Sequence, residues 1–284
     1  MDMMKKLYEV ILVQGWWIYR MLFKACHLEI HLADHCNLNC AGCSHYSPLA
    51  NPTFCDISQL YYSLSKLSDF ANEFRTIRLL GGEPLLNPGV VDVIKAVRSY
   101  FPNTHIELLS NGIMLMSPYA EHINETFWES CRKNNIVISI SIYPTRTDDN
   151  FIKKVCLEKG VKFNIYGDRT KKSCFKLYSL NPKRHGCRMN YYRCRESDFL
   201  QLVDGKIFSC AQCAYVGHLN RAFGYNFEHR KGDYIAVDSI DSIFALRLFR
   251  LKSKPFCKYC VFPRQQTDWH LSERKSAEWI QENV

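Results

Sequence analysis

The stretch Cys36-Asn-Leu-Asn-Cys40-Ala-Gly-Cys43 places three thiols on a loop that follows an alternating segment, 27–32, which predicts a strand. Thiolates are soft ligands that suit iron–sulfur clusters. Closed structural zinc sites take four ligands, so three close cysteines indicate a cluster with one iron left open. Because His35 and His45 could each supply a fourth ligand, a zinc site with three cysteines and one histidine stays an alternative.

Helices and strands alternate on both sides of this loop. The short spacing between them favours an α/β protein, in which crossover helices join the strands of a parallel sheet. We expect helices over 57–74, 90–100, 117–134 and 150–159, and further strands over 76–80, 105–110, 136–142 and 161–165.

The pattern changes near Lys171. The residues Asp204-Gly205 separate two apolar runs, 199–203 and 206–209, and predict a hairpin, because Asp-Gly suits a tight type I′ turn. Further helices are predicted near 240–251 and over 271–281. We therefore expect three parts, which are an N-terminal helix (1–26), a main α/β domain (27–170) and a cysteine-bearing C-terminal part (171–284).

Composition indicates an ordinary globular protein with unusual cysteine content. The chain has 284 residues, 47% of them hydrophobic, and 14 cysteines. In a chain of this length without an export signal, clustered cysteines favour metal or redox chemistry over disulfides. The apolar run 7–23 contains Glu9 and Arg20 and is short for a membrane span. We expect this run to form a helix that packs on the body of the protein, or an interfacial or partner-binding helix. We also expect a cytoplasmic protein without a membrane anchor.

The chain carries a net charge of +9, and part of the excess is local. From Lys171 to Arg195 there are eight basic residues and no acidic one. This stretch is either a solvated face or a surface for an anionic substrate, such as a phosphorylated or nucleotide-linked compound. No nucleic-acid-binding motif is present, so we expect no nucleic-acid partner.

Two motifs together resemble the radical S-adenosylmethionine (SAM) superfamily over about residues 28–165. Cys-x3-Cys-x2-Cys at 36–43 follows the first strand, and Gly81-Gly82-Glu83-Pro84 follows the second. The resemblance implies a partial (β/α)6 barrel with its chemistry at the C-terminal ends of the strands. It also implies that the three cysteines hold a [4Fe–4S] cluster and that SAM chelates the open iron.

The same resemblance implies roles for residues after each strand. Gly81, Gly82 and Glu83 would hold the methionyl amino group, because glycine backbone allows close approach and the carboxylate accepts hydrogen bonds. Ser141 matches the position that contacts the ribose. Ser110 and Asn111 either line the same pocket or are simply the polar end of a strand.

One position departs from the pattern of the family. An aromatic residue usually precedes the third cysteine and contacts the adenine, whereas this chain has Gly42. Either Tyr46 covers the base instead, or backbone contacts hold it.

A second set of cysteines resembles the Twitch form of the SPASM auxiliary domain, over about residues 190–262. The resemblance implies an auxiliary [4Fe–4S] cluster that is fully ligated by cysteine and therefore suited to moving an electron. Its ligands would be Cys194, Cys210, Cys257 and Cys260.

Two other thiols compete for this second site. Cys213 forms a Cys-x2-Cys pair with Cys210, and Cys187 lies seven residues before Cys194. Either could replace an assigned ligand. A structural zinc ribbon built from the pairs 210/213 and 257/260 is a further alternative.

The resemblance implies reductive cleavage of SAM to a 5′-deoxyadenosyl radical that abstracts a substrate hydrogen. A chain of this length with one auxiliary cluster resembles the 2-deoxy-scyllo-inosamine dehydrogenases, so we expect a radical SAM oxidoreductase that oxidises or epimerises a sugar-like or cyclitol substrate. The alternatives are a maturase of ribosomal peptides, an activase of a glycyl-radical protein, and a non-catalytic zinc-stabilised binding protein.

The substrate should meet the strand ends between the two clusters. From position alone, the candidates there are Tyr143, Tyr166, Asp168 and Arg169, although each could be an ordinary loop residue. We expect two kinds of partner, a small-molecule substrate and an electron donor of the flavodoxin or ferredoxin type.

Overall fold

The computed structural model describes residues 26–118, 120–144, 148–166, 179–183, 190–191, 194–262 and 264–281, together with Gly15 and Tyr19. For residues 174–176 and 195 only the backbone is described. The N-terminal helix predicted over 1–26 lies almost wholly outside this range. Among the described residues, no helix is long and apolar enough to cross a membrane.

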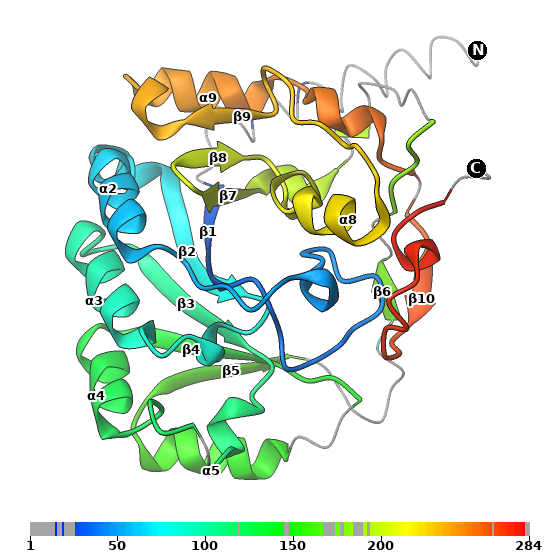
Figure 1. Ribbon diagram of the computed structural model, residues 1–284. Coiled ribbons are helices and arrows are strands. Elements are labelled where there is room, and N and C mark those ends of the chain that lie inside the picture. The colour runs from blue at the N-terminus through cyan, green and yellow to red at the C-terminus, as the bar shows by residue number, and fades with distance from the viewer. Residues whose placement is uncertain are drawn as a thin grey trace, which may run out of the picture.

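The fold is built on one sheet of eight strands in the order β5-β4-β3-β2-β1-β7-β8-β9 (Figure 1). The first five strands and β7 run parallel, whereas β8 and β9 are antiparallel to their neighbours. The α/β prediction is confirmed. The strands are β1 (Cys26–Ala33), β2 (Phe74–Gly81), β3 (His105–Ser110), β4 (Ile136–Ser141), β5 (Lys162–Tyr166), β7 (Phe199–Val203), β8 (Lys206–Phe208) and β9 (Tyr234–Ala236).

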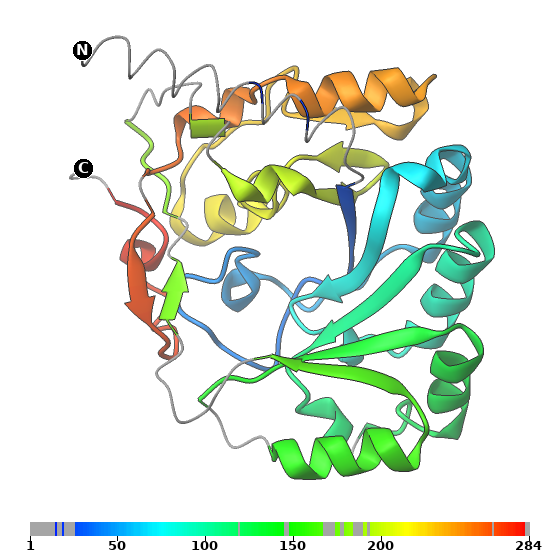
Figure 2. The same cartoon turned by 180° about the vertical axis from the view of Figure 1, so that it is seen from behind.

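The helices that connect β1 to β5 cover one face of the parallel strands, as both views show (Figures 1 and 2). Side chains at the N-caps set where three of them begin, because each accepts hydrogen bonds from the free N–H groups of the first turn. Asp56 caps α2, Asn124 caps α4 and Asp148 caps α5. The helices are α2 (Ile57–Leu67), α3 (Val90–Tyr100), α4 (Glu125–Lys133) and α5 (Asp149–Glu158).

The core lies between the sheet and these helices. Successive side chains of a strand point to opposite faces, and Leu28, Ile30 and Leu32 of β1 are fully buried in this core. The other face of the sheet is polar. There Arg78 lies 3.5 Å from the carboxylate of Glu29 and 3.2 Å from that of Glu107. Pairing keeps these buried charges compensated.

The C-terminal half extends the same sheet. Asp204 and Gly205 have φ angles of 46° and 72°, which confirms the predicted hairpin turn between β7 and β8. Strand β7 pairs with β1, so the sheet is continuous across the boundary predicted near residue 170, and that boundary stays a prediction. Helices α7 (Ala211–Ala214), α8 (Val216–Phe223) and α9 (Ile243–Leu251) follow.

Two predicted helices differ in the structure. The helix predicted over 117–134 begins only at Glu125, because Asn124 is its cap. The helix predicted over 271–281 is wrong, since Arg274 has a φ of 55° and only a short 3-10 turn, Ser276–Glu278, forms. Just before it, β10 (Gln266–Asp268) pairs with β6 (Cys174–Lys176).

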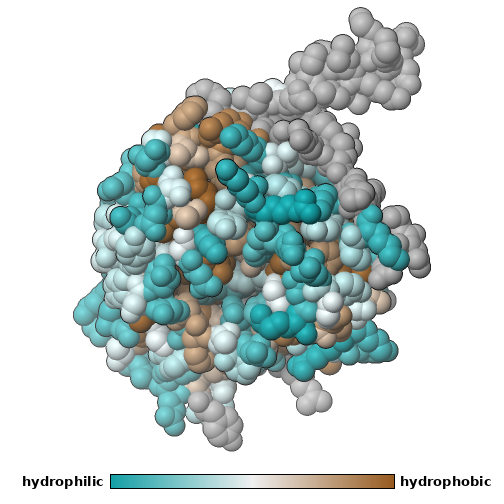
Figure 3. All heavy atoms as spheres, turned by 45° about the horizontal axis from the view of Figure 1, so that its top comes forward, coloured by the Kyte–Doolittle hydropathy of each residue, from teal (hydrophilic) through white to brown (hydrophobic). Residues whose placement is uncertain are grey.

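The face that contains α9 is mostly hydrophilic, with small hydrophobic patches between the polar groups (Figure 3). On α9 itself, the side chain of Phe244 is 62% exposed. Scattered apolar residues are normal on the surface of a globular protein.

Candidate functional site

A cavity of about 240 Å³ lies at the carboxyl ends of the strands and gathers residues that are far apart in the sequence. All three cysteines of the first motif line it, and so does the glycine–glycine–glutamate motif. The predicted residues that line this cavity are Cys36, Cys40, Cys43, Gly81, Gly82, Glu83, Ser110, Asn111, Ser141 and Tyr143.

The two glycines bring the end of β2 against the root of the cysteine loop. The backbone N–H of Gly82 donates to the carbonyl of Ala33 at 2.7 Å, and that of Glu83 donates to the carbonyl of His35 at 3.1 Å. A Cβ atom on Gly82 would lie only 2.1 Å from the carbonyl oxygen of His35. Glycine is therefore required there by close backbone approach.

Glu83 is a buried carboxylate beside the cysteines. It accepts hydrogen bonds from the Ser110 hydroxyl at 2.7 Å and from the backbone N–H groups of Asn111 at 2.9 Å and Leu85 at 3.1 Å. Burial raises the pKa of Glu83 to about 7, although these donors oppose the shift. A carboxyl group held in this way is suited to binding an ammonium group, whose positive charge favours its ionised form.

N–H groups approach two of the three sulfurs. The indole N–H of Trp269 donates to Cys40 Sγ at 3.1 Å, and the backbone N–H of Leu38 donates to Cys36 Sγ at 3.3 Å. Burial raises the pKa of Cys40 to about 12 and also raises that of Cys36. Because a bound metal deprotonates its thiol ligands, the donor set and its N–H partners fit an iron–sulfur cluster.

Residues 266–281, which we name the C-terminal strap, lie against the cysteine loop. The backbone N–H of Ala41 donates to the His270 carbonyl at 3.0 Å. The indole N–H of Trp279 donates to the Cys43 carbonyl at 2.9 Å. No motif in the sequence predicts that this segment contacts the cysteine loop, since its only signal is two tryptophans far downstream of the cysteines.

The aromatic residue at the cavity is Tyr143. Tyr46, a candidate for covering the adenine, is fully buried, and its hydroxyl donates to the Gln212 carbonyl at 3.4 Å; it does not line this cavity. Gly42 has a φ of 64°, in the left-handed region that favours glycine.

Of the remaining substrate candidates, only Tyr166 lies among the described residues. Tyr166 ends β5, is 56% exposed and does not line the cavity. Asp168 and Arg169 lie outside the described residues.

The cysteines of the second set lie near one another. The pKa of Cys210 is raised well above its usual value, first by burial and then by the charges of Cys260, Cys257 and Cys194. Cys213 is also buried in this neighbourhood, and burial raises its pKa as well. Cys187 lies outside the described residues.

An arginine and a lysine lie beside these thiols. Arg264 Nη2 donates to Cys194 Sγ at 2.7 Å. Lys254 is buried, and burial lowers its pKa to about 7 although the nearby Cys257 and Asp233 oppose the shift. Positive groups beside thiols favour the thiolate form that binds metal.

The zinc alternatives require ligands that converge on one ion. Within the described part of the chain, no group of three or more His, Cys, Asp or Glu side chains is placed so that it could hold a metal ion. The thiolates of a four-iron cluster bind different irons and need not converge on one point.

Comparison with known proteins gives one domain family. The model of the radical SAM superfamily matches residues 30–164. GTP 3′,8-cyclase of Clostridium perfringens is 28% identical over 151 residues, which cover 49% of this chain and 45% of that protein. GTP 3′,8-cyclase of Trichormus variabilis is 32% identical over 103 residues, covering 34% and 30%. The matched region thus spans less than half of the length of these relatives.

The match to one of the solved structures extends over nearly the whole length of that protein. The crystal structure of BtrN in complex with AdoMet and 2-DOIA has a TM-score of 0.50 and 14% sequence identity, and the match covers 83% of this chain and 92% of BtrN. At this identity the likeness shows the fold. The fold agrees with the family match, which identifies a radical SAM domain at residues 30–164 of this chain.

Proposed function

We propose that this chain reductively cleaves SAM to methionine and a 5′-deoxyadenosyl radical, which abstracts a hydrogen atom from a sugar-like or cyclitol small molecule and leads to its oxidation or epimerisation. The observation that carries this proposal is the single cavity in which Cys36, Cys40 and Cys43 meet Glu83. Those cysteines would hold a [4Fe–4S] cluster, which would supply one low-potential electron and an open iron.

The residues of the chain would then bind and orient SAM. Glu83, held by Ser110 and Asn111, would bind the methionyl ammonium group, and Gly82 would let the backbone come close to it. Ser141 would contact the ribose, and Tyr143 would exclude water on the side where the substrate enters.

Oxidation would release one further electron and one proton from the substrate radical. The second group of cysteines supports an auxiliary [4Fe–4S] cluster that accepts this electron, and Cys194, Cys210, Cys257 and Cys260 would be its ligands. BtrN, whose fold this chain shares, has been crystallised with AdoMet and 2-DOIA. The GTP 3′,8-cyclases are named for a nucleotide, which supports a phosphorylated or nucleotide-linked substrate.

The proposal places the protein in the cytoplasm, with a flavodoxin-type or ferredoxin-type protein as its electron donor. A reducing compartment would keep the cysteines as thiols that are available to bind iron.

The decisive experiment is anaerobic reconstitution with iron and sulfide, followed by SAM and dithionite. We expect 5′-deoxyadenosine from the wild type and none from the Cys36→Ala/Cys40→Ala/Cys43→Ala variant. Metal analysis of the same samples distinguishes the proposed iron–sulfur enzyme from the zinc-binding alternative, which predicts zinc without sulfide. A fully iron-loaded protein that never cleaves SAM would contradict the proposal.

The substrate class is tested by deuterium transfer into 5′-deoxyadenosine. Deuterated amino sugars, cyclitols and sugar nucleotides form one panel, and cysteine-containing peptides form the other. Transfer only from peptides would favour the maturase alternative.

A further inference from the structure

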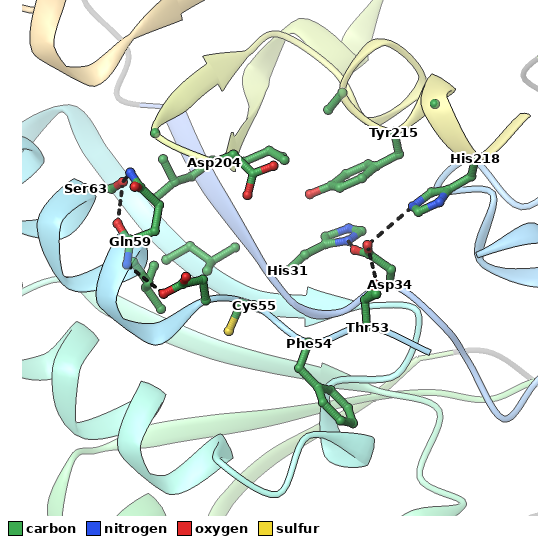
Figure 4. A pocket seen from close by; sticks show the side chains of 18 of the residues that line it. His31, Asp34, Thr53, Phe54, Cys55, Gln59, Ser63, Asp204, Tyr215 and His218 are labelled. Atoms are coloured by element: carbon green, nitrogen blue, oxygen red, sulfur yellow. Dashed lines mark hydrogen bonds and ion pairs between the residues drawn. The ribbon is translucent and has the colours of Figure 1, made fainter. Parts of the chain in front are cut away.

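We propose that a second cavity in this protein binds a small hydroxylated amine. The cavity has a volume of about 550 Å³ and shares no lining residue with the cysteine-lined cavity. It is bounded by the end of β1, residues 51–56, the first turns of α2, the turn between β7 and β8, and α8 (Figure 4).

The charge of this cavity is opposite to that of the whole protein. Asp34, Asp56 and Asp204 line it against one guanidinium, that of Arg221, whereas the chain as a whole carries +9. Burial lowers the pKa of His218, so this ring adds no positive charge near neutral pH. A surplus of carboxylates inside a basic protein selects a cation.

Two deeply buried polar atoms at this cavity lack partners. Tyr215 is 5% exposed and His31 is 7% exposed. Their rings stack, with centroids 3.8 Å apart and an angle of 11° between the ring planes. Within the described residues, neither the Tyr215 hydroxyl nor His31 Nε2 has a hydrogen-bond partner. Buried polar groups are almost always paired, so a ligand with hydroxyl groups would satisfy atoms that the protein leaves unmet.

The three carboxylates are not equivalent. Asp34 accepts a hydrogen bond from Thr53 at 2.9 Å and lies 3.5 Å from both His31 and His218. Asp56 is occupied as the cap of α2. These two therefore shape the site electrostatically and are not free to bind a ligand directly.

Asp204 is the carboxylate that remains for a ligand. It has no hydrogen bond or ion pair with the described residues, and Figure 4 shows its carboxylate turned toward the Tyr215 hydroxyl. Burial raises the pKa of Tyr215, and the charges of Asp34, Glu29 and Asp204 add to this shift. We assign the amine of the ligand to Asp204 and an adjacent hydroxyl group to Tyr215.

Arg221 does not reverse this preference. Its Nη2 donates to His218 Nδ1 at 2.6 Å, and the residue is exposed at the rim. The three carboxylates that line the cavity would repel an anionic ligand as it enters. The site therefore discriminates amine from neutral and acidic ligands of the same shape.

The test uses three sugars of one ring size, which are glucosamine, glucose and glucuronate. Each is titrated calorimetrically into the full chain with its clusters loaded, without dithionite. We expect saturable binding of glucosamine, at least tenfold weaker binding of glucose and no binding of glucuronate. Because no SAM cleavage is involved, the outcome is independent of the proposed radical chemistry.

Variants locate the site. Asp204→Asn removes the charge but keeps a residue that tolerates a positive φ, so the turn is preserved. Tyr215→Phe removes only the hydroxyl. We expect each to weaken glucosamine binding about tenfold, the cost of one lost polar contact. Asp241→Asn, at an exposed acidic residue outside the cavity, should leave it unchanged.

Three results would overturn the proposal. They are the absence of saturable glucosamine binding, equal affinity for the three sugars, or unchanged affinity in Asp204→Asn. The last variant decides the question even where Tyr215→Phe fails to fold, because Asp204 lies on an exposed turn.

Discussion

The indole N–H of Trp269 donates to the sulfur of Cys40 across a separation of 229 residues in the chain. A hydrogen bond to a ligating sulfur stabilises the more negative, reduced state of an iron–sulfur cluster, and so raises its reduction potential. The C-terminal strap therefore takes part in the site as well as covering it.

Trp269→Phe should lower the reduction potential of the first cluster. A net hydrogen bond of about 1 kcal/mol corresponds to roughly 40 mV for a one-electron couple. Redox titration followed by electron paramagnetic resonance measures the shift. Trp279→Phe is the matched control, because its N–H donates to the Cys43 carbonyl and not to a sulfur. An equal shift in both variants would mean that loosening of the strap, and not the N–H···S bond, is responsible.

Glu83 should make the stability of the ligand-free protein depend on pH. Its pKa is about 7 in the folded protein against an ordinary value of 4.5, so the folded state holds a proton that the unfolded chain releases in this window. The free energy of unfolding should therefore fall as pH rises from 4.5 to 7, by up to about 3 kcal/mol.

Chemical denaturation at several pH values checks this expectation. The side chain introduced by Glu83→Gln cannot titrate, so this variant should lose the part of the pH dependence of the free energy of unfolding that comes from Glu83. The same variant should also bind SAM more weakly, since the ammonium group loses its anionic partner. A slope that is identical in both proteins would assign the pH dependence to other groups.

Gly82→Ala should destabilise the protein by several kcal/mol, because its new methyl group would overlap the His35 carbonyl. We expect the variant to lose iron from the first cluster as well. Gly217→Ala is the opposite case. Its Cβ atom would meet nothing closer than 3.6 Å within α8, so it should stabilise the helix by about 0.5–1 kcal/mol. Thermal unfolding and iron content of both variants measure the contrast.

Substitution of the cysteines near the auxiliary site should change the iron content of the protein only where the cysteine is a ligand. Two four-iron clusters give about eight irons per chain, and Cys194→Ser or Cys257→Ser should reduce this to about four. Cys213→Ser should retain all eight, because we assign its buried thiol to the core and not to the ligand set. Iron loss in Cys213→Ser, together with full iron loading in Cys194→Ser, would mean that Cys213 is a ligand of the auxiliary cluster and Cys194 is not.

Local sequence signals were sufficient to predict most of the helices and strands of the main domain. The predicted helix over 90–100 and strand over 105–110 match α3 and β3, because apolar periodicity and burial coincide there. The turn at Asp204-Gly205 was equally readable, since few sequences suit two successive positive φ angles. Of the site, the three cysteines and Gly81–Glu83 were found because their spacing is itself the signal.

Long-range contacts were not readable in the same way. Periodicity suggested a helix over 271–281, but this segment pairs with the cysteine loop, and tertiary hydrogen bonds outweighed its local preference. Nothing near Tyr215 indicates that it stacks on His31, because the two lie far apart in sequence and meet only when α8 folds over the end of β1.

The position of the C-terminal strap also sets an order of events during synthesis. The cysteine loop leaves the ribosome long before Trp269 and Trp279 exist, because 229 and 236 residues separate them from Cys40 and Cys43. A nascent chain therefore presents this loop uncovered. Iron and sulfide delivered after the strap has docked must enter past its hydrogen bonds, so the cluster should be easier to load before docking than after it.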